Sequence, residues 1–158
     1  MRIVCAGHCN WDVRFRVDRL PSPDGEGRIK RRRESGGGSA ANVAVGLAEL
    51  DREAHFLGAV GDDARGDSAV ERLERAGVVP HVRVDGALAT TAKYLLVDDA
   101  GQVALLGTEG ANAAFDPSAP PESILGSAAA LHLTGQDPAT AAELARPARA
   151  AGSTVSPA

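Results

Sequence analysis

The stretch S-G-G-G-S-A-A-N-V-A at residues 35–44 is the most informative part of this chain, because three glycines open a run of small residues typical of a buried helix. Glycine has no Cβ, so its backbone can approach a ligand closely. The first turn of a helix offers N–H groups that have no partner inside the helix and that suit hydroxyl or phosphate oxygens. Asn42 adds a side chain that both donates and accepts. We therefore expect a polar ligand here.

A second polar cluster directly follows the first predicted strand. The apolar residues 3–6 lead into G-H-C-N-W-D at residues 7–12, which places Asn10 and Asp12 at the carboxyl end of that strand. Ligands of open α/β sheets bind at this end. A carboxylate that faces hydroxyl groups accepts charge-assisted hydrogen bonds, which are the stronger kind. His8 is the one histidine close to this predicted pocket.

The order of the predicted elements indicates an α/β fold. Strands at about 2–7, 54–60 and 128–134 alternate with helices at about 39–50, 65–76 and 138–151, which is the pattern of a mostly parallel sheet. Of the adjacent Asp62 and Asp63, we expect one to cap helix 65–76. This helix is expected to carry its charged residues outward: Arg65, Asp67, Glu71, Arg72, Glu74 and Arg75. Pro117, Pro120 and Pro121 mark a loop.

Other segments have a different hydrophobic periodicity. Apolar Val13, Phe15 and Val17 alternate with polar residues, a period of two that indicates a strand with one wet face. Segments 27–33, 81–85, 91–97 and 102–106 are similar. We predict that they form a small antiparallel sheet apart from the α/β core.

Composition narrows the class of protein. A net charge of −4 gives no broad attraction to nucleic acid or to an anionic membrane, and no apolar run is long enough to span a bilayer. The N-terminus enters a strand without a signal segment, so we expect a cytoplasmic protein. Aromatic residues make up only 3% of the chain, so the basic run at residues 28–33 is interpreted as a solvated face. Neither the two cysteines nor the four histidines have the spacing of a metal site.

Together these segments resemble the ribokinase-like carbohydrate kinases, also called the PfkB family. Asn10 and Asp12, with G-G-x-x-x-N at 37–42, resemble the family's sugar-binding signature. Further matches follow in the family's order: G-A-V-G-D-D-A-R-G at 58–66, the lid hairpin at 90–101 with G-A-N at 110–112, and L-H-L-T-G at 131–135.

The resemblance implies a ribokinase-like three-layer sandwich, of which residues 1–158 are the N-terminal part, with an incomplete parallel sheet. It implies a β lid drawn from about 13–33 and 81–106. The implied activity is ATP-dependent phosphorylation of a sugar or nucleoside hydroxymethyl group by the complete enzyme, with Mg²⁺. The implied substrate-binding residues are Asn10, Asp12, Gly37, Gly38, Ser39, Asn42, Lys93 and Gln136. Lys93, Tyr94 and Gln136 are the expected specificity contacts, and a homodimer through the lid is expected because many family members pair in this way.

The family's D-T-x-G-A-G-D segment supplies the catalytic Asp and the anion hole, and no G-A-G-D occurs in this sequence. We therefore predict no catalytic, cofactor or metal residue in this chain and expect the chain alone to be inactive. Two alternatives stay open: a non-catalytic carbohydrate-binding or lid-dimerising module, and an unstable truncated product. The spacing G-x-G-x-x-A at 36–41 also fits a dinucleotide fingerprint, but K-R-R-R-E at 30–34 stands where that motif needs an apolar strand.

Overall fold

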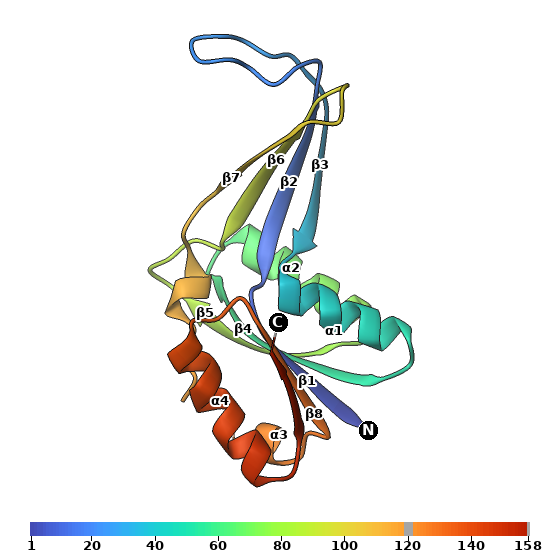
Figure 1. Cartoon of the computed structure of the whole chain (residues 1–158), viewed down its shortest axis with the longest axis vertical. Coiled ribbons are helices and arrows are strands. Elements are labelled where there is room, and N and C mark those ends of the chain that lie inside the picture. Colours follow the sequence, from blue (N-terminus) through green and yellow to red (C-terminus); the bar gives the residue numbers. More distant parts are fainter. Residues whose placement is uncertain (119–121, 158) are drawn as a thin grey trace.

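The computed structural model describes residues 1–118 and 122–157 and places them in two sheets (Figure 1). The larger sheet has the strand order β5-β4-β1-β8-β9, and all its pairs are parallel. Its strands are β1 (Arg2–Gly7), β4 (Glu53–Gly61), β5 (Val79–Asp85), β8 (Ala130–Thr134) and β9 (Thr154–Pro157). The predicted α/β fold with a mostly parallel sheet is confirmed. Of the predicted loop, Pro120 and Pro121 lie outside the described residues.

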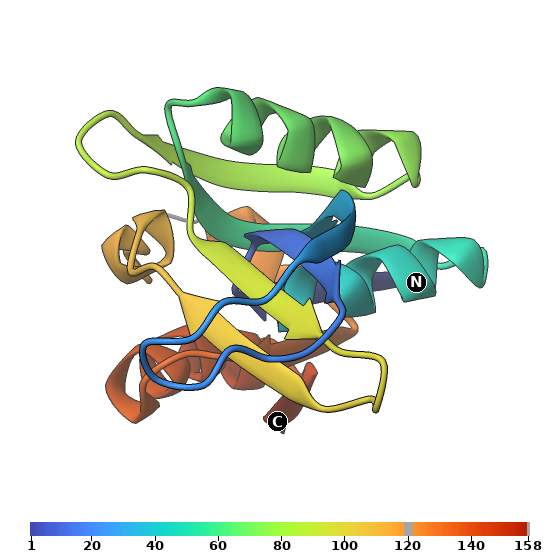
Figure 2. The same cartoon turned by 90° about the horizontal axis from the view of Figure 1, so that it is seen from above.

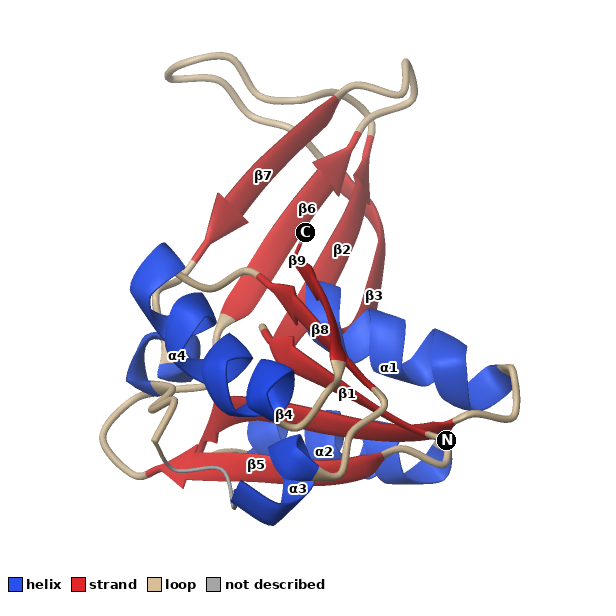
Figure 3. Cartoon of the chain, turned by 60° about the horizontal axis from the view of Figure 1, so that its bottom comes forward, coloured by secondary structure: helices blue, strands red, loops and turns tan. Residues whose placement is uncertain are grey.

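Helices cover both faces of the larger sheet and make three layers (Figure 3). On one face lie α1 (Ser39–Glu49) and α2 (Ala64–Arg75), and on the other α3 (Glu122–Gly126) and α4 (Pro138–Ala150). β4 contacts the helices on both faces of the sheet, because successive side chains of a strand point to opposite faces. Phe56 packs with α1 and α2, and Leu57 packs with α3 and α4. The small residues of α1 lie flat against the sheet, with Ala40, Ala41 and Ala44 buried.

The start of α2 confirms the predicted cap. Asp63 is the N-cap residue, and its Oδ1 accepts a 2.8 Å hydrogen bond from the backbone N–H of Gly66. Both carboxylate oxygens also accept from Thr90, at 2.8 Å each. The carboxylate thus joins the helix to the residues that enter the small sheet.

The small sheet stands above the layered body, as Figures 1 and 2 show from two directions. Its order is β3-β2-β6-β7, from β2 (Asn10–Val17), β3 (Ile29–Gly37), β6 (Ala92–Val97) and β7 (Val103–Gly107). The two outer pairs are antiparallel, as predicted, and the central β2–β6 pair is parallel. Only His8 and Cys9 separate the first core strand from this sheet, so Asn10 and Asp12 lie where the two sheets meet.

One assignment to the small sheet was wrong. Segment 81–85 belongs to β5, which pairs in parallel with β4 as the edge strand of the larger sheet. An edge strand with one exposed side has the same alternating pattern as a strand of a sheet with one solvent-exposed face, so periodicity alone could not distinguish the two.

Among the described residues, no helix is long and apolar enough to cross a membrane.

Candidate active site

A cavity of about 390 Å³ opens at the carboxyl ends of β1 and β8, beneath the small sheet. Its walls come from the two strand ends, from β6, from the 3₁₀ turn η1 (Ala111–Ala114) and from the start of α4. The polar and charged side chains that line it are His8, Thr91, Lys93, Thr108, Glu109, Asn112, Gln136, Asp137 and Thr140. This is the edge of the sheet where α/β proteins bind ligands.

Asp12 lies on β2 directly opposite Lys93 of β6, the two being partners in the parallel register. The Nζ atom of Lys93 lies against Gly107 of β7, and Lys93 forms no ion pair with Asp12 in the described part of the chain. The Oδ1 atom of Asp12 is shielded from solvent and has no hydrogen-bond partner among the described residues. Burial raises the pKa of Asp12 above its ordinary value, and the charges of Arg14, Arg72 and Lys93 oppose that rise. Asp12 is therefore an acceptor to which the described protein offers no donor.

The glycine run brings backbone close to Asp12 and to the end of β1. A Cβ on Gly37 would overlap the Asp12 carboxylate, so only glycine leaves that space open. Gly38 is the N-cap residue of α1, with φ of 99°, and a Cβ there would overlap the carbonyl of His8. The N–H of Ala41, in the first turn of α1, donates to the same carbonyl at 3.4 Å. Helix α1 is thus fixed to the strand end beside the cavity.

The G-A-N segment connects the cavity with the first polar cluster. Nδ2 of Asn112 donates to Oδ1 of Asn10 at 2.7 Å, and Oδ1 of Asn112 accepts from the backbone N–H of Cys9 at 3.1 Å. The N–H of Asn112 donates to Oγ1 of Thr91 at 3.3 Å. Asn10 is buried and does not itself line the cavity, whereas its partner Asn112 does.

Helix α2 contributes a cation to the glycine turn. Nη2 of Arg72 donates to Oδ1 of Asn42 at 3.3 Å, and the Arg72 side chain packs over Gly36, where a Cβ would lie 2.7 Å from its Cδ. Asn42 is exposed on α1. The expectation that Arg65 and Arg72 point outward from the helix was wrong, because both side chains turn toward the small sheet: Arg72 packs over Gly36, and Arg65 donates to Tyr94 of β6. Arg72 lies 30 positions from Asn42 in the chain, and no local pattern links the two.

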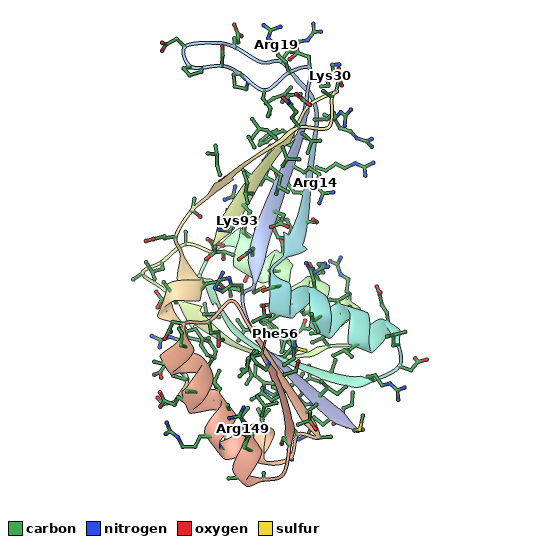
Figure 4. The ribbon with its side chains drawn as sticks, in the orientation of Figure 1. Arg14, Arg19, Lys30, Phe56, Lys93 and Arg149 are labelled. Carbon is green, nitrogen blue, oxygen red and sulfur yellow. The ribbon has the colours of Figure 1, made fainter. Side chains whose placement is uncertain are left out.

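The predicted site residues fall into two neighbouring groups. Lys93 and Gln136 line the cavity, and Oε1 of Gln136 is shielded from solvent without a hydrogen-bond partner among the described residues. Asp12, Gly37, Gly38, Ser39 and Asn42 lie around the start of α1, where Ser39 is exposed. The Asp12–Lys93 pair and the contact of Gly38 with His8 join the groups. Figure 4 places Lys93 on the small sheet, above the core residue Phe56.

Tyr94 does not belong to this site. Its hydroxyl accepts a 3.1 Å hydrogen bond from Nη1 of Arg65 on α2, and it does not line the cavity. Neighbours on a strand point to opposite faces, so Tyr94 must face away from the side that carries Lys93. The expectation that Tyr94 contacts the substrate was wrong. No local sequence signal indicates the contacts of Arg72 and Asn112, because they form only when elements distant in the sequence meet.

The sequence of this chain matches a known family and several curated proteins. The family model of the pfkB family carbohydrate kinases matches residues 1–157, so the chain belongs to that family. An ATP-dependent ribose-1-phosphate kinase of Halopiger xanaduensis is 53% identical over 157 residues, which cover 99% of this chain and 53% of the relative. A nucleoside kinase of Methanothermobacter thermautotrophicus is 30% identical over 98% of this chain and 50% of its own length.

Solved structures show the same fold. Arabidopsis thaliana ribokinase, complexed with ribose and ATP, superposes with a TM-score of 0.86 at 27% identity, covering 98% of this chain and 51% of that one. The nucleoside kinase of Methanocaldococcus jannaschii gives a TM-score of 0.83 at 26% identity, covering 99% and 51%. The ribokinase-like fold is confirmed. The chain spans about half the length of the curated relatives it matches, 53% and 50% for the two above.

Proposed function

We propose that this chain forms the acceptor-binding part and lid of an ATP-dependent kinase that phosphorylates a hydroxymethyl group of a sugar or nucleoside. The observation that carries the proposal is the shielded Oδ1 atom of Asp12, which has no partner among the described residues and lies against Gly37 at the junction of the two sheets. A buried carboxylate oxygen without a donor is costly, and hydroxyl groups of a bound sugar would satisfy it.

The site residues have distinct proposed roles. Asp12 accepts hydrogen bonds from sugar hydroxyls, while Asn10 and Asn112 hold the β1–β2 junction in place. Gly37 and Gly38 leave room for the ligand beside the Asp12 carboxylate and the His8 carbonyl. Gln136 offers its unpartnered oxygen from the cavity wall. The small sheet would act as a lid that keeps water from the acceptor, a recurrent device of phosphoryl-transfer sites.

ATP would supply the phosphoryl group, and Mg²⁺ would neutralise the charge of its phosphates. Among residues 1–118 and 122–157, no group of three or more His, Cys, Asp or Glu side chains could hold a metal ion. The catalytic Asp motif of the family does not occur in the sequence. We therefore assign no residue of this chain to ATP, to Mg²⁺ or to the proton transfer.

Two acceptor classes are the first to test. The Halopiger xanaduensis relative is a ribose-1-phosphate kinase, and the Methanothermobacter thermautotrophicus relative is a nucleoside kinase. The alternative function, a sugar-binding or lid-dimerising module, is favoured by one observation, the exposed apolar residues Val103, Leu105 and Leu106 on the edge strand β7. The cytoplasmic location and the homodimer stay predictions.

The test uses the native protein that carries this chain, with ATP, Mg²⁺ and a panel of ribose, ribose 1-phosphate, fructose and nucleosides. ADP release that depends on one of these acceptors, with a phosphorylated product identified by mass spectrometry, is the expected result. Binding of an acceptor without any ADP release would support the non-catalytic module instead. Neither binding nor turnover with any member of the panel would contradict the proposal.

A further inference from the structure

We infer, resting on the proposed function, that the acceptor is a sugar that already carries a phosphate group, and that Arg14 and Lys93 bind this phosphate. Both residues belong to the face of the small sheet that carries Asp12. Arg14 lies two positions beyond Asp12 on β2, and Lys93 lies opposite Asp12 on β6. Residues two apart on a strand share a face, and diagonal neighbours on adjacent strands lie within reach of long side chains. Figure 4 labels both side chains on this sheet.

The charges on this face are unbalanced. Arg14 and Lys93 form no ion pair with a carboxylate in the part of the chain that the structure describes. Arg33 of β3, which stands opposite Arg14, forms no ion pair there either. The three positive charges of Arg14, Arg33 and Lys93 exceed the one negative charge of Asp12 by two. A phosphate monoester carries about −1.5 to −2 charges near neutral pH, which matches this excess.

Two cross-strand pairs of arginines on the same face, each forming a row across β2 and β3, can be compared. Arg14 stands directly opposite Arg33 of β3, and Arg16 stands directly opposite Arg31. Like charges directly opposite each other destabilise a sheet. In the outer row Asp99 relieves the repulsion, because its Oδ1 lies 3.4 Å from Nε of Arg16. The Arg14–Arg33 row has no such carboxylate among the described residues and lies nearer to Asp12, so a bound phosphate would take the place that Asp99 fills further out.

The same face is poorly suited to an uncharged nucleoside. A nucleobase gains affinity by stacking on aromatic side chains. Alternation along the strands puts Trp11 and Phe15 of β2 and Tyr94 of β6 on the opposite face. Hydrogen bonds hold two of these rings in place: Nε1 of Trp11 donates to Glu34 at 2.6 Å, and the hydroxyl of Tyr94 accepts from Arg65. On the Asp12 face, β2 and β6 therefore offer cations and aliphatic residues, and Phe115 is the aromatic side chain among the described residues that line the cavity. A nucleoside would leave Lys93 without a counter-ion.

The experiment measures kcat/KM of the native protein for ribose 1-phosphate, ribose and adenosine, with wild type, Arg14→Gln, Lys93→Gln and Arg16→Gln. A hydrogen bond to a charged group contributes about 1.5–3 kcal/mol, so we expect each of the first two variants to lose about 10- to 100-fold for ribose 1-phosphate. Their KM for ATP should not change. Arg16→Gln is the matched control, since Asp99 already pairs with that residue of the same strand.

A measurement on the wild type makes the test independent of how the variants fold. KM for ribose 1-phosphate should rise with ionic strength, because salt screens the attraction between exposed charges. The inference is overturned if ribose or adenosine is used as efficiently as ribose 1-phosphate, or if the variants raise KM for ATP instead of the acceptor. In both cases the kinase itself stands. Absence of turnover with every acceptor would instead remove the proposed function.

Discussion

Nδ2 of Asn112 donates a 2.7 Å hydrogen bond to Oδ1 of Asn10, which joins two residues that lie 102 positions apart in the sequence. The same Asn112 amide accepts from the N–H of Cys9. Both atoms of one side chain are therefore used to hold the η1 turn against the β1–β2 junction. Because Asp12 follows Asn10 by two residues, this pair also sets the position of the proposed sugar acceptor.

Asn112→Ala should destabilise the protein by about 1–3 kcal/mol, because it leaves Asn10 and the N–H of Cys9 without their partner in a partly buried site. Urea unfolding of the native protein measures the change. Asn42→Ala is the matched control: Asn42 is exposed and accepts only the 3.3 Å bond from Arg72, so the free energy of unfolding should hardly change. Equal losses in the two variants would contradict this account.

Gly37→Ala should impair acceptor binding, since the new Cβ would overlap the Asp12 carboxylate and displace it. A displacement of about 1 Å can cost on the order of 10²-fold in rate, so we expect kcat/KM for the acceptor to fall by about that factor. Gly46→Ala, within α1, is the control, because a Cβ there meets nothing within 4 Å. Alanine also favours helix, so this variant should keep its activity and gain about 0.5–1 kcal/mol of stability. An unchanged kcat/KM for the acceptor in Gly37→Ala would show that acceptor binding does not depend on the position of this carboxylate.

The two histidines of β4 and β5 predict a loss of stability in mild acid. Nδ1 of His55 lies 2.9 Å from Nε2 of His81, and the rings are stacked. Burial is the main cause that lowers the pKa of both histidines below the ordinary value. The charge of His55 lowers the pKa of His81 further, Arg2 lowers both, and Glu53 raises the pKa of His55. The unfolded chain therefore binds more protons than the folded one. Stability should be complete above the unfolded pKa of about 6.5 and should fall as the pH drops below it.

Chemical unfolding between about pH 7.5 and pH 5.5 tests this linkage, because ordinary carboxylates titrate below that window. His81→Gln should reduce the slope of unfolding free energy against pH, since one of the two groups that must be desolvated is removed. A slope that is identical in wild type and variant would contradict the role of the pair.

The edges of the small sheet predict how a lid-mediated homodimer would form. β3 is protected by basic residues, among them Lys30 and Arg31, which discourage pairing. β7 is exposed and apolar, with Val103 and Leu105 about 60% exposed. Leu105→Lys should therefore shift a dimer toward monomer in light scattering, whereas Val84→Lys on the edge of the larger sheet should not. A dimer that survives Leu105→Lys would place the interface elsewhere.

Much of the architecture could be predicted from local sequence. The Asp63 cap and the buried alanines of α1 follow from patterns within a few residues, and so do the strand ends that position Asn10 and Asp12. The family resemblance supplied the rest of the site. It could not supply contacts between distant elements: Arg72 on Asn42 and the His55–His81 pair depend on how strands and helices are brought together. The assignment of segment 81–85 was wrong for a related reason: its period of two indicates a strand but does not indicate which sheet the strand joins.

The most direct test of the central claim is the acceptor kinetics of Asp12→Asn in the native protein, with Asp24→Asn, at the exposed tip of the small sheet, as the matched control. The substitution keeps the size of the side chain and removes the charge that accepts the sugar hydroxyls. We predict that kcat/KM for the acceptor falls by about 10- to 100-fold in Asp12→Asn, with KM for ATP and the control unchanged. An acceptor kcat/KM equal to that of the wild type would show that Asp12 does not bind the sugar.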